Sequence, residues 1–137
     1  MTLDPGLAGR TFGPSTAYTV SREKIREFER AIGVPAGGGG ATAPLTFPII
    51  VAFEVLELLL NDPDVGLELR NVVHAAQRFD QVRPLRAGDE VQATLTVDSV
   101  RSAAGADLLA TTTQVTTTHG ELLCTAVASL VHRSSTP

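Results

Sequence analysis

The fold of this chain is decided by the stretch Phe47-Pro48-Ile49-Ile50-Val51-Ala52-Phe53-Glu54-Val55-Leu56-Glu57-Leu58-Leu59-Leu60. Thr46 stands immediately before it and can cap a helix, and Asn61-Asp62-Pro63 ends the helix. Apart from Glu54 and Glu57, the helix is apolar on nearly every face, which is typical of a helix enclosed by other structure. We therefore expect the remainder of the chain to wrap around it.

Strand patterns follow this helix. In the run Val91–Val100, apolar residues alternate with polar ones, which predicts a strand with one buried and one solvated face. Arg101–Gly105 is expected to form a hairpin loop and His119-Gly120 a two-residue turn, so the strands should form an antiparallel meander. The four predicted strands are Val72–Val82, Val91–Val100, Asp107–Thr118 and Glu121–His132.

A helix enclosed by a meander predicts the α+β class. The arrangement expected is a single hotdog domain over residues 1–137, in which an antiparallel curved sheet wraps around a long central helix. The length of 137 residues and the 43% hydrophobic content suit one core.

The part of the chain before the central helix carries a second helix. Ser15–Val20 is predicted to be a short strand, and Ser21 caps a charged helix that ends at Gly33. Its buried stripe is expected to consist of Ile25, Phe28 and Ile32. The run Gly37–Gly40 that follows has high backbone entropy and no side chains to pack, so we expect a loop that is mobile or shaped around a ligand.

The charge balance and the single cysteine exclude several classes of function. Lys plus Arg number 11 and Asp plus Glu 15, giving a net charge of −4, which argues against nucleic acid and anionic membranes as partners. Cys124 cannot form an intrachain disulfide, and no Cys/His spacing suits a metal site. With no long apolar stretch free of charge, a cytoplasmic protein is expected.

Few residues have chemistry of their own. Among the three histidines, His74 on a predicted strand is the best candidate, either as a packed side chain or as a catalyst. His119 in a turn and His132 at a strand end are expected to face solvent. Cys124 should be a small buried hydrophobe and not a nucleophile.

The acidic residues near the central helix fall into two groups. Asp62 and Asp64 flank Pro63 and are expected to form a turn. Glu54 and Glu57 lie three residues apart on one helix face, so one of them is expected at an edge, a cleft or a partner surface.

Three motifs together resemble the MaoC-like dehydratases, in particular the FAS1-like N-terminal branch that includes accessory subunits of mycobacterial (3R)-hydroxyacyl-ACP dehydratases. The motifs are Ser21-Arg22-Glu23-Lys24-Ile25-Arg26-Glu27-Phe28, Ala43-Pro44-Leu45-Thr46-Phe47, and His74-Ala75-Ala76-Gln77-Arg78-Phe79 followed by Arg83-Pro84-Leu85-Arg86-Ala87-Gly88-Asp89. The resemblance implies a hotdog subunit that pairs side by side with another, forming one continuous sheet and a tunnel for an acyl thioester.

The reaction that this resemblance implies is the reversible loss of water from a 3-hydroxyacyl thioester, without a metal or redox cofactor. Catalytic members place an Asp, an Asn-Pro and a His between the two helices, where carboxylate and imidazole share acid–base duty. In this chain the segment is Gly33–Thr42, which contains no titratable side chain. No catalytic residue and no metal ligand is therefore expected here.

Three functions remain open at this point. The first is an accessory subunit, inactive alone, whose partner hotdog chain supplies the Asp and His; the resemblance then implies Thr46, Phe47, His74 and Gln77 as residues that bind substrate, here an acyl-ACP or acyl-CoA thioester. The second is a homodimeric acyl-binding module without catalysis. The third is a hotdog thioesterase, for which Glu54 is the only available carboxylate.

Overall fold

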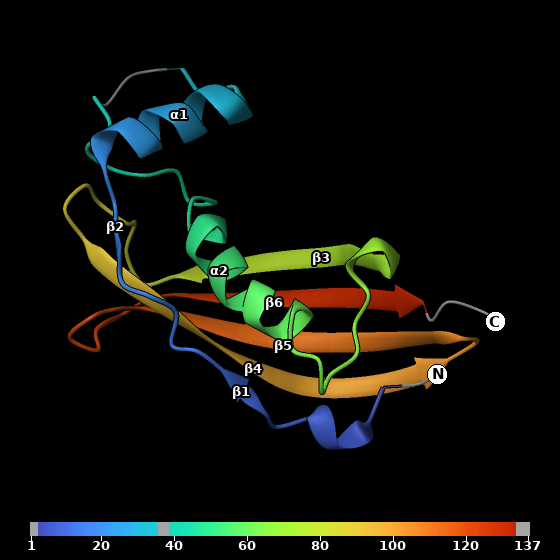
Figure 1. Cartoon of the computed structure of the whole chain (residues 1–137). Helices are drawn as coiled ribbons and strands as arrows, with labels where there is room; N and C mark the ends of the chain where they lie inside the picture. Colours follow the sequence, from blue (N-terminus) through green and yellow to red (C-terminus); the bar gives the residue numbers. More distant parts are fainter. Residues whose placement is uncertain (1–2, 36–38, 134–137) are drawn as a thin grey trace.

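The computed structural model describes residues 3–35 and 39–133. Gly37 and Gly38 lie outside these residues, so for them the expectation of a mobile or ligand-shaped loop stays a prediction. The elements, shown in Figure 1, are η1 (Pro5–Leu7), β1 (Thr11–Phe12), β2 (Tyr18–Thr19), α1 (Arg22–Ile32), α2 (Ile49–Leu60), η2 (Leu69–Asn71), β3 (Val72–Gln81), β4 (Glu90–Ala103), β5 (Ala106–Thr117) and β6 (Leu122–Arg133).

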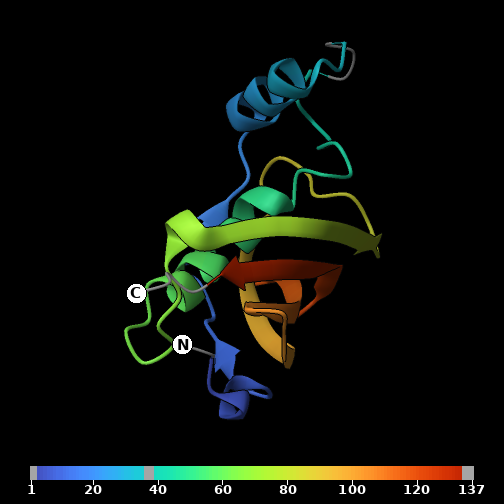
Figure 2. The same ribbon diagram turned by 90° about the vertical axis from the view of Figure 1, so that its right-hand side faces the viewer.

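The strands form one antiparallel sheet in the order β1-β4-β5-β6-β3, and β2 pairs with β4. The sheet curves around α2, which confirms the predicted α+β hotdog class (Figures 1 and 2). The expected four-strand meander is wrong in one respect, because only β4, β5 and β6 follow one another. The first long strand, β3, joins the far edge beside β6, so the segment between β3 and β4 crosses over the sheet.

Both hairpin connections differ in length from their predictions. Strand β4 ends at Ala103 and β5 begins at Ala106. Ala104-Gly105 alone therefore makes the turn, with φ of 52° and 79°. Two successive residues with positive φ are what a tight type I′ hairpin turn requires. The β5–β6 turn is longer than expected, because the Thr117 N–H donates to the carbonyl of Glu121 and encloses His119-Gly120 within it.

Helix α2 begins later than its sequence indicates, and Thr46 does not cap it. Pro48 occupies the N-cap position without any side-chain cap, and the Ile49 and Ile50 N–H groups donate to the Thr46 and Phe47 carbonyls. A tight turn thus satisfies the amides that a capping hydroxyl would otherwise bind. Thr46 itself is exposed.

The described chain covers α2 on one side only, which corrects the expectation of a fully enclosed helix. Val51, Val55 and Leu59 are completely buried against the sheet, whereas Phe53 and Leu58 are 45% and 46% exposed. A helix that is apolar all round needs cover on every face, but its sequence does not say whether that cover comes from its own chain. Phe53 lies beside His74 of β3, the edge strand, whereas Leu58 borders Pro14 and Ser15.

Helix α1 lies over the beginning of α2, apart from the body of the sheet (Figure 2). The rings of Phe28 and Phe47 meet edge to face at 5.4 Å between centroids, and Phe47 has no exposed surface. The predicted stripe is partly wrong: Ile25 is buried and Phe28 partly so, but Ile32 is 46% exposed and Glu29 is buried instead. Because Ile32 is the last residue of α1, it lies past the surface that the helix covers.

The amino-terminal segment belongs to the core, which its Gly/Pro-rich sequence did not predict. Leu3, Leu7 and Phe12 are buried, and β1 pairs with β4. Within the described residues, no helix has both the length and the apolar character needed to cross a membrane.

Candidate functional site

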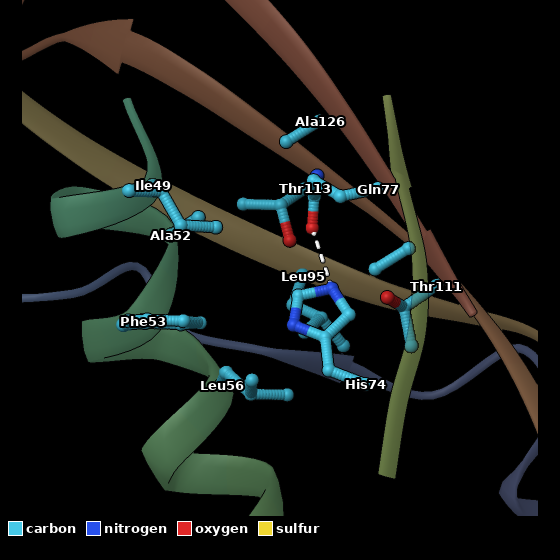
Figure 3. A pocket seen from close by; sticks show the side chains of 11 residues that line it. Ile49, Ala52, Phe53, Leu56, His74, Gln77, Leu95, Thr111, Thr113 and Ala126 are labelled. Atoms are coloured by element: carbon cyan, nitrogen blue, oxygen red, sulfur yellow. Dashed lines mark hydrogen bonds between the residues drawn. The ribbon is translucent and has the colours of Figure 1, made fainter. Parts of the chain in front are cut away.

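The side chains of His74 and Gln77 lie together on the inner side of β3, facing α2 (Figure 3). His74 Nε2 and Gln77 Oε1 are 2.9 Å apart, and Gln77 Nε2 donates to the Arg78 carbonyl. A bulge in the pairing of β3 with β6 between His74 and Ala76 changes the strand's alternation at this point. The bulge is therefore what brings a histidine and a glutamine three residues apart into contact.

The hydrogen bonds define which ring nitrogen of the His74 imidazole donates. Because the Gln77 amide nitrogen is engaged by a carbonyl, its oxygen faces His74 and can only accept. His74 therefore donates from Nε2–H, and in the neutral ring Nδ1 is an acceptor. The ring also meets Phe53 of α2 edge to face, with 6.2 Å between centroids.

A small cavity separates His74 and Gln77 from α2. Its volume is about 20 Å³, room for one water molecule. Thr111 and Thr113, both buried, add hydroxyl groups to a wall that is otherwise mostly aliphatic. The full lining is Ile49, Ala52, Phe53, Leu56, His74, Gln77, Leu95, Thr111, Thr113, Ala126 and Ala128. None of these residues is acidic.

The cavity continues into an apolar groove along the uncovered face of α2. This groove has a volume of about 290 Å³ and shares Phe53, Leu56 and His74 with the cavity. Leu69, which is 69% exposed, and Leu130 belong to its wall, and so does one carboxylate, Glu57. A mostly apolar groove with a histidine and a glutamate in its wall suits an apolar ligand that carries a polar group.

Two of the four predicted substrate-binding residues, His74 and Gln77, meet at the cavity, and the other two do not. Phe47 is packed into the core under α1, and Thr46 is exposed in the turn before α2. Neither lines the cavity or the groove. Thr111 and Thr113 line the cavity, although they were not predicted from the sequence. The signal available for them was their position opposite aliphatic residues in an alternating strand.

Of the other candidate carboxylates, Glu57 lines the groove, whereas Glu54 and Asp62 lie elsewhere. Glu54 lines a hollow with Pro14, Ser15 and Glu57, and it does not line the cavity beside His74. Asp62 accepts the Asp64 N–H at 2.8 Å and pairs with Arg10 at 3.2 Å, the structural role expected of it.

His132 contradicts the expectation of a solvent-facing side chain. It is 2% exposed, its Nδ1 lies 3.7 Å from Asp107 Oδ2, and its Nε2 accepts the Glu68 N–H at 3.1 Å. Asp107 is 1% exposed and accepts the Ser102 hydroxyl. The strand alternation held the signal, since His132 is in phase with the buried Leu130. This pair joins four segments of the chain and lines neither the cavity nor the groove.

Cys124 is buried, as predicted, and burial raises the pKa of its thiol to about 11. A thiol with this pKa is almost entirely protonated at neutral pH, so it is a packing residue. The Arg83–Asp89 motif is also structural. Arg83 binds both Asp89 oxygens, at 2.9 and 3.1 Å, and this contact holds the pKa of Asp89 below its usual range.

Comparison with known proteins agrees with this architecture. A family model for the FAS1-like dehydratase domain region matches residues 7–126. The UPF0336 protein of Streptomyces griseus is 40% identical, with 98% of each chain covered. That of Saccharopolyspora erythraea is 37% identical, covering 98% of this chain and 94% of the other.

A solved structure gives the same result. A chain of the HadBC (3R-hydroxyacyl-ACP dehydratase) complex from Mycobacterium tuberculosis superposes with a TM-score of 0.80 and 31% identity, covering 96% of this chain and 99% of that one. The residues that the family model matches include α1, α2 and the strands from β1 to the first part of β6. The chain therefore belongs to the FAS1-like dehydratase family and is a MaoC-like dehydratase subunit with a hotdog fold.

Proposed function

We propose that this chain is a noncatalytic accessory subunit of a (3R)-hydroxyacyl-thioester dehydratase. In this assignment, a partner hotdog chain supplies the Asp and His, and this chain supplies part of the wall around the acyl group. The observation that carries the proposal is chemical. Elimination of water needs one group to remove a proton and another to protonate the departing hydroxyl, and the segment Gly33–Thr42 contains neither an acid nor a base.

Among the described residues, one carboxylate and one imidazole line the groove, Glu57 and His74, but the imidazole Nε2 bonds to Gln77 and not to the carboxylate. The cavity holds one histidine, His74, whose only side-chain hydrogen-bond partner is an amide. The one His–Asp pair of the described chain, His132 with Asp107, is closed off from solvent and joined to backbone and hydroxyl groups. His74 is thus paired with an amide, and the buried pair lines neither the cavity nor the groove.

The surface of the chain supports a partner. Strand β3 is an edge strand that pairs only with β6, and most of its residues are exposed, including Val73 at 62%. Such an edge is a template for pairing with another chain. Beside it, Phe53 and Leu69 present an apolar surface that a second hotdog subunit would bury. The similar HadBC protein is itself a complex.

The groove suits the acyl part of the substrate. Its apolar walls would bind the hydrocarbon chain, while His74 and Gln77 form one polar place at which the thioester or hydroxyl end is oriented. Thr46 and Phe47 lie at the start of α2. Phe47 packs in the core and so fixes the position of the helix. The substrate class is a 3-hydroxyacyl or trans-2-enoyl thioester of CoA or of acyl carrier protein.

Hydration of a crotonyl thioester, followed by ultraviolet absorbance, tests the proposal. The isolated chain should show no turnover, and co-expression with a MaoC-like chain that carries the Asp and His should give a stable complex with higher activity than that partner alone. His74→Ala should raise the KM of the complex, whereas His119→Ala, an exposed control on the β5–β6 turn, should leave it unchanged.

Two results would contradict this assignment. Turnover by the isolated chain that is lost in His74→Ala would show that His74 is itself a catalytic base. A chain that only self-associates, with an acyl ligand bound and no affinity for a catalytic partner, would instead be a homodimeric acyl-binding module.

A further inference from the structure

The groove along α2 contains a carboxylate that no cation of the described chain neutralises. Glu57 lies one helical turn after Phe53 and three residues before Leu60, so the three side chains project from the face of α2 that lines the groove. Glu57 is exposed, and it also borders the hollow that Glu54 lines. Among the described residues, no Lys, Arg or His nitrogen lies within 4 Å of its carboxylate. The Glu57 charge is therefore available to a ligand in the groove.

The second polar side chain in the wall of the groove is His74. Its Nε2–H is engaged by the Gln77 amide oxygen at 2.9 Å, so Nδ1 is the ring nitrogen that remains for a ligand. Figure 3 shows this nitrogen on the side of the ring that faces α2. No described residue donates a hydrogen bond to it. In the neutral imidazole, His74 therefore offers the groove an acceptor and no free donor.

The side chains that line the groove thus present hydrogen-bond acceptors and no free donor. A carboxylate only accepts, and the wall residues other than Glu57 and His74 are hydrocarbon: Phe53, Leu56, Leu60, Leu69, Val72 and Leu130. A ligand oxygen that only accepts, as in an ether, would lose its hydration here without gaining a hydrogen bond. A ligand carboxylate would in addition be repelled by Glu57. A hydroxyl group, in contrast, can donate to either acceptor.

We infer that Glu57 is a specificity-determining residue, which makes the groove select alkyl chains that carry a hydroxyl group and reject chains that end in a carboxylate. The hydrocarbon walls bind the chain, and the hydroxyl donates to the Glu57 carboxylate, with His74 Nδ1 as the second acceptor. The inference rests on the proposed function, because that function supplies a hydroxylated acyl chain and its unsaturated counterpart. The unsaturated chain has no hydroxyl to donate, so the groove favours the hydroxylated one.

Amide NMR titration of the isotope-labelled full chain tests this inference with three probes: n-octanol, its isomer heptyl methyl ether, and octanoate. We expect n-octanol to bind about three- to tenfold more tightly than the ether, the factor that one net hydrogen bond supplies, and octanoate to bind more weakly than n-octanol. The amides of Phe53, Glu57 and Val72 should shift. Glu57→Leu should lose most of the preference for the alcohol, and Glu57→Gln the discrimination against octanoate. Glu54→Gln is the matched control, because Glu54 lies on the same helix but does not line the groove.

Several outcomes overturn the inference. These are equal affinity for n-octanol and the ether, octanoate binding as tightly as n-octanol, an unchanged preference in Glu57→Leu, shifts confined to residues outside the groove, and no binding of any probe. The readouts need neither a partner nor turnover, so they separate this inference from the accessory role. An active complex with an unselective groove contradicts the inference alone, and a selective groove in a chain that activates no partner contradicts the accessory role alone.

Discussion

Truncation of Phe47 tests whether this side chain packs the core or binds substrate. Only a core residue should lower the thermal stability of the chain strongly when it is truncated. The side chain is completely buried and meets Phe28 edge to face at 5.4 Å. Truncation of a buried Phe to Ala costs about 3–5 kcal/mol, the lost transfer free energy plus the cavity left behind. For 137 residues the entropy of unfolding is roughly 0.29 kcal/mol/K, so Phe47→Ala should lower Tm by roughly 10–17 °C.

Thermal unfolding followed by circular dichroism measures this shift. The milder Phe47→Leu variant keeps the measurement possible if Phe47→Ala does not fold, and it should cost at most about 1.5 kcal/mol, or roughly 5 °C. Leu45→Ala is the control two residues away, since Leu45 is 60% exposed and should change stability by less than about 0.5 kcal/mol. A loss of under roughly 3 °C in Phe47→Ala would refute the packing argument.

Three further substitutions or modifications test other contacts. Asp89→Asn should destabilise the chain by about 1–2 kcal/mol at neutral pH, because it breaks the charged contact with Arg83. The pKa of Asp89 is lowered by folding, so this stabilisation is present above the usual carboxyl range and disappears as pH falls through the lowered pKa; urea denaturation at several pH values checks the sign. Cys124 should resist a thiol reagent at pH 8 in the native state and react only after unfolding, so rapid native labelling would mean that the site opens. Gly40→Ala should reduce the urea midpoint more than Gly66→Ala does, because both have positive φ but only Gly40 meets a backbone oxygen; equal losses would rule out the close contact.

The local elements could be predicted because each depends on neighbours in the sequence. The alternation in β4 and the apolar run of α2 appear where they were expected, and Ser21 does cap α1 through its hydroxyl. Thr46 was predicted to cap in the same way and does not, because the preceding turn satisfies those amides first. Local propensity fixes which residues can cap, and the path of the backbone decides which of them do.

The candidate site was only half predictable for a related reason. His74 and Gln77 were selected from a motif, but their contact depends on a bulge in β3, and nothing local in the sequence specifies a register shift against β6. His132 was assigned to solvent from its place at a strand end, whereas the order of the strands and the amino-terminal segment bury it.

By itself, the sequence determined the elements, the hotdog class and the absence of an acid–base pair between α1 and α2, since periodicity and residue chemistry are properties of single segments. Only the tertiary structure decided that β3 lies at the sheet edge, that one face of α2 is left uncovered, and that Glu57 and His74 line one groove. These features depend on contacts between residues distant in the chain, which become neighbours only after the sheet has closed around the helix.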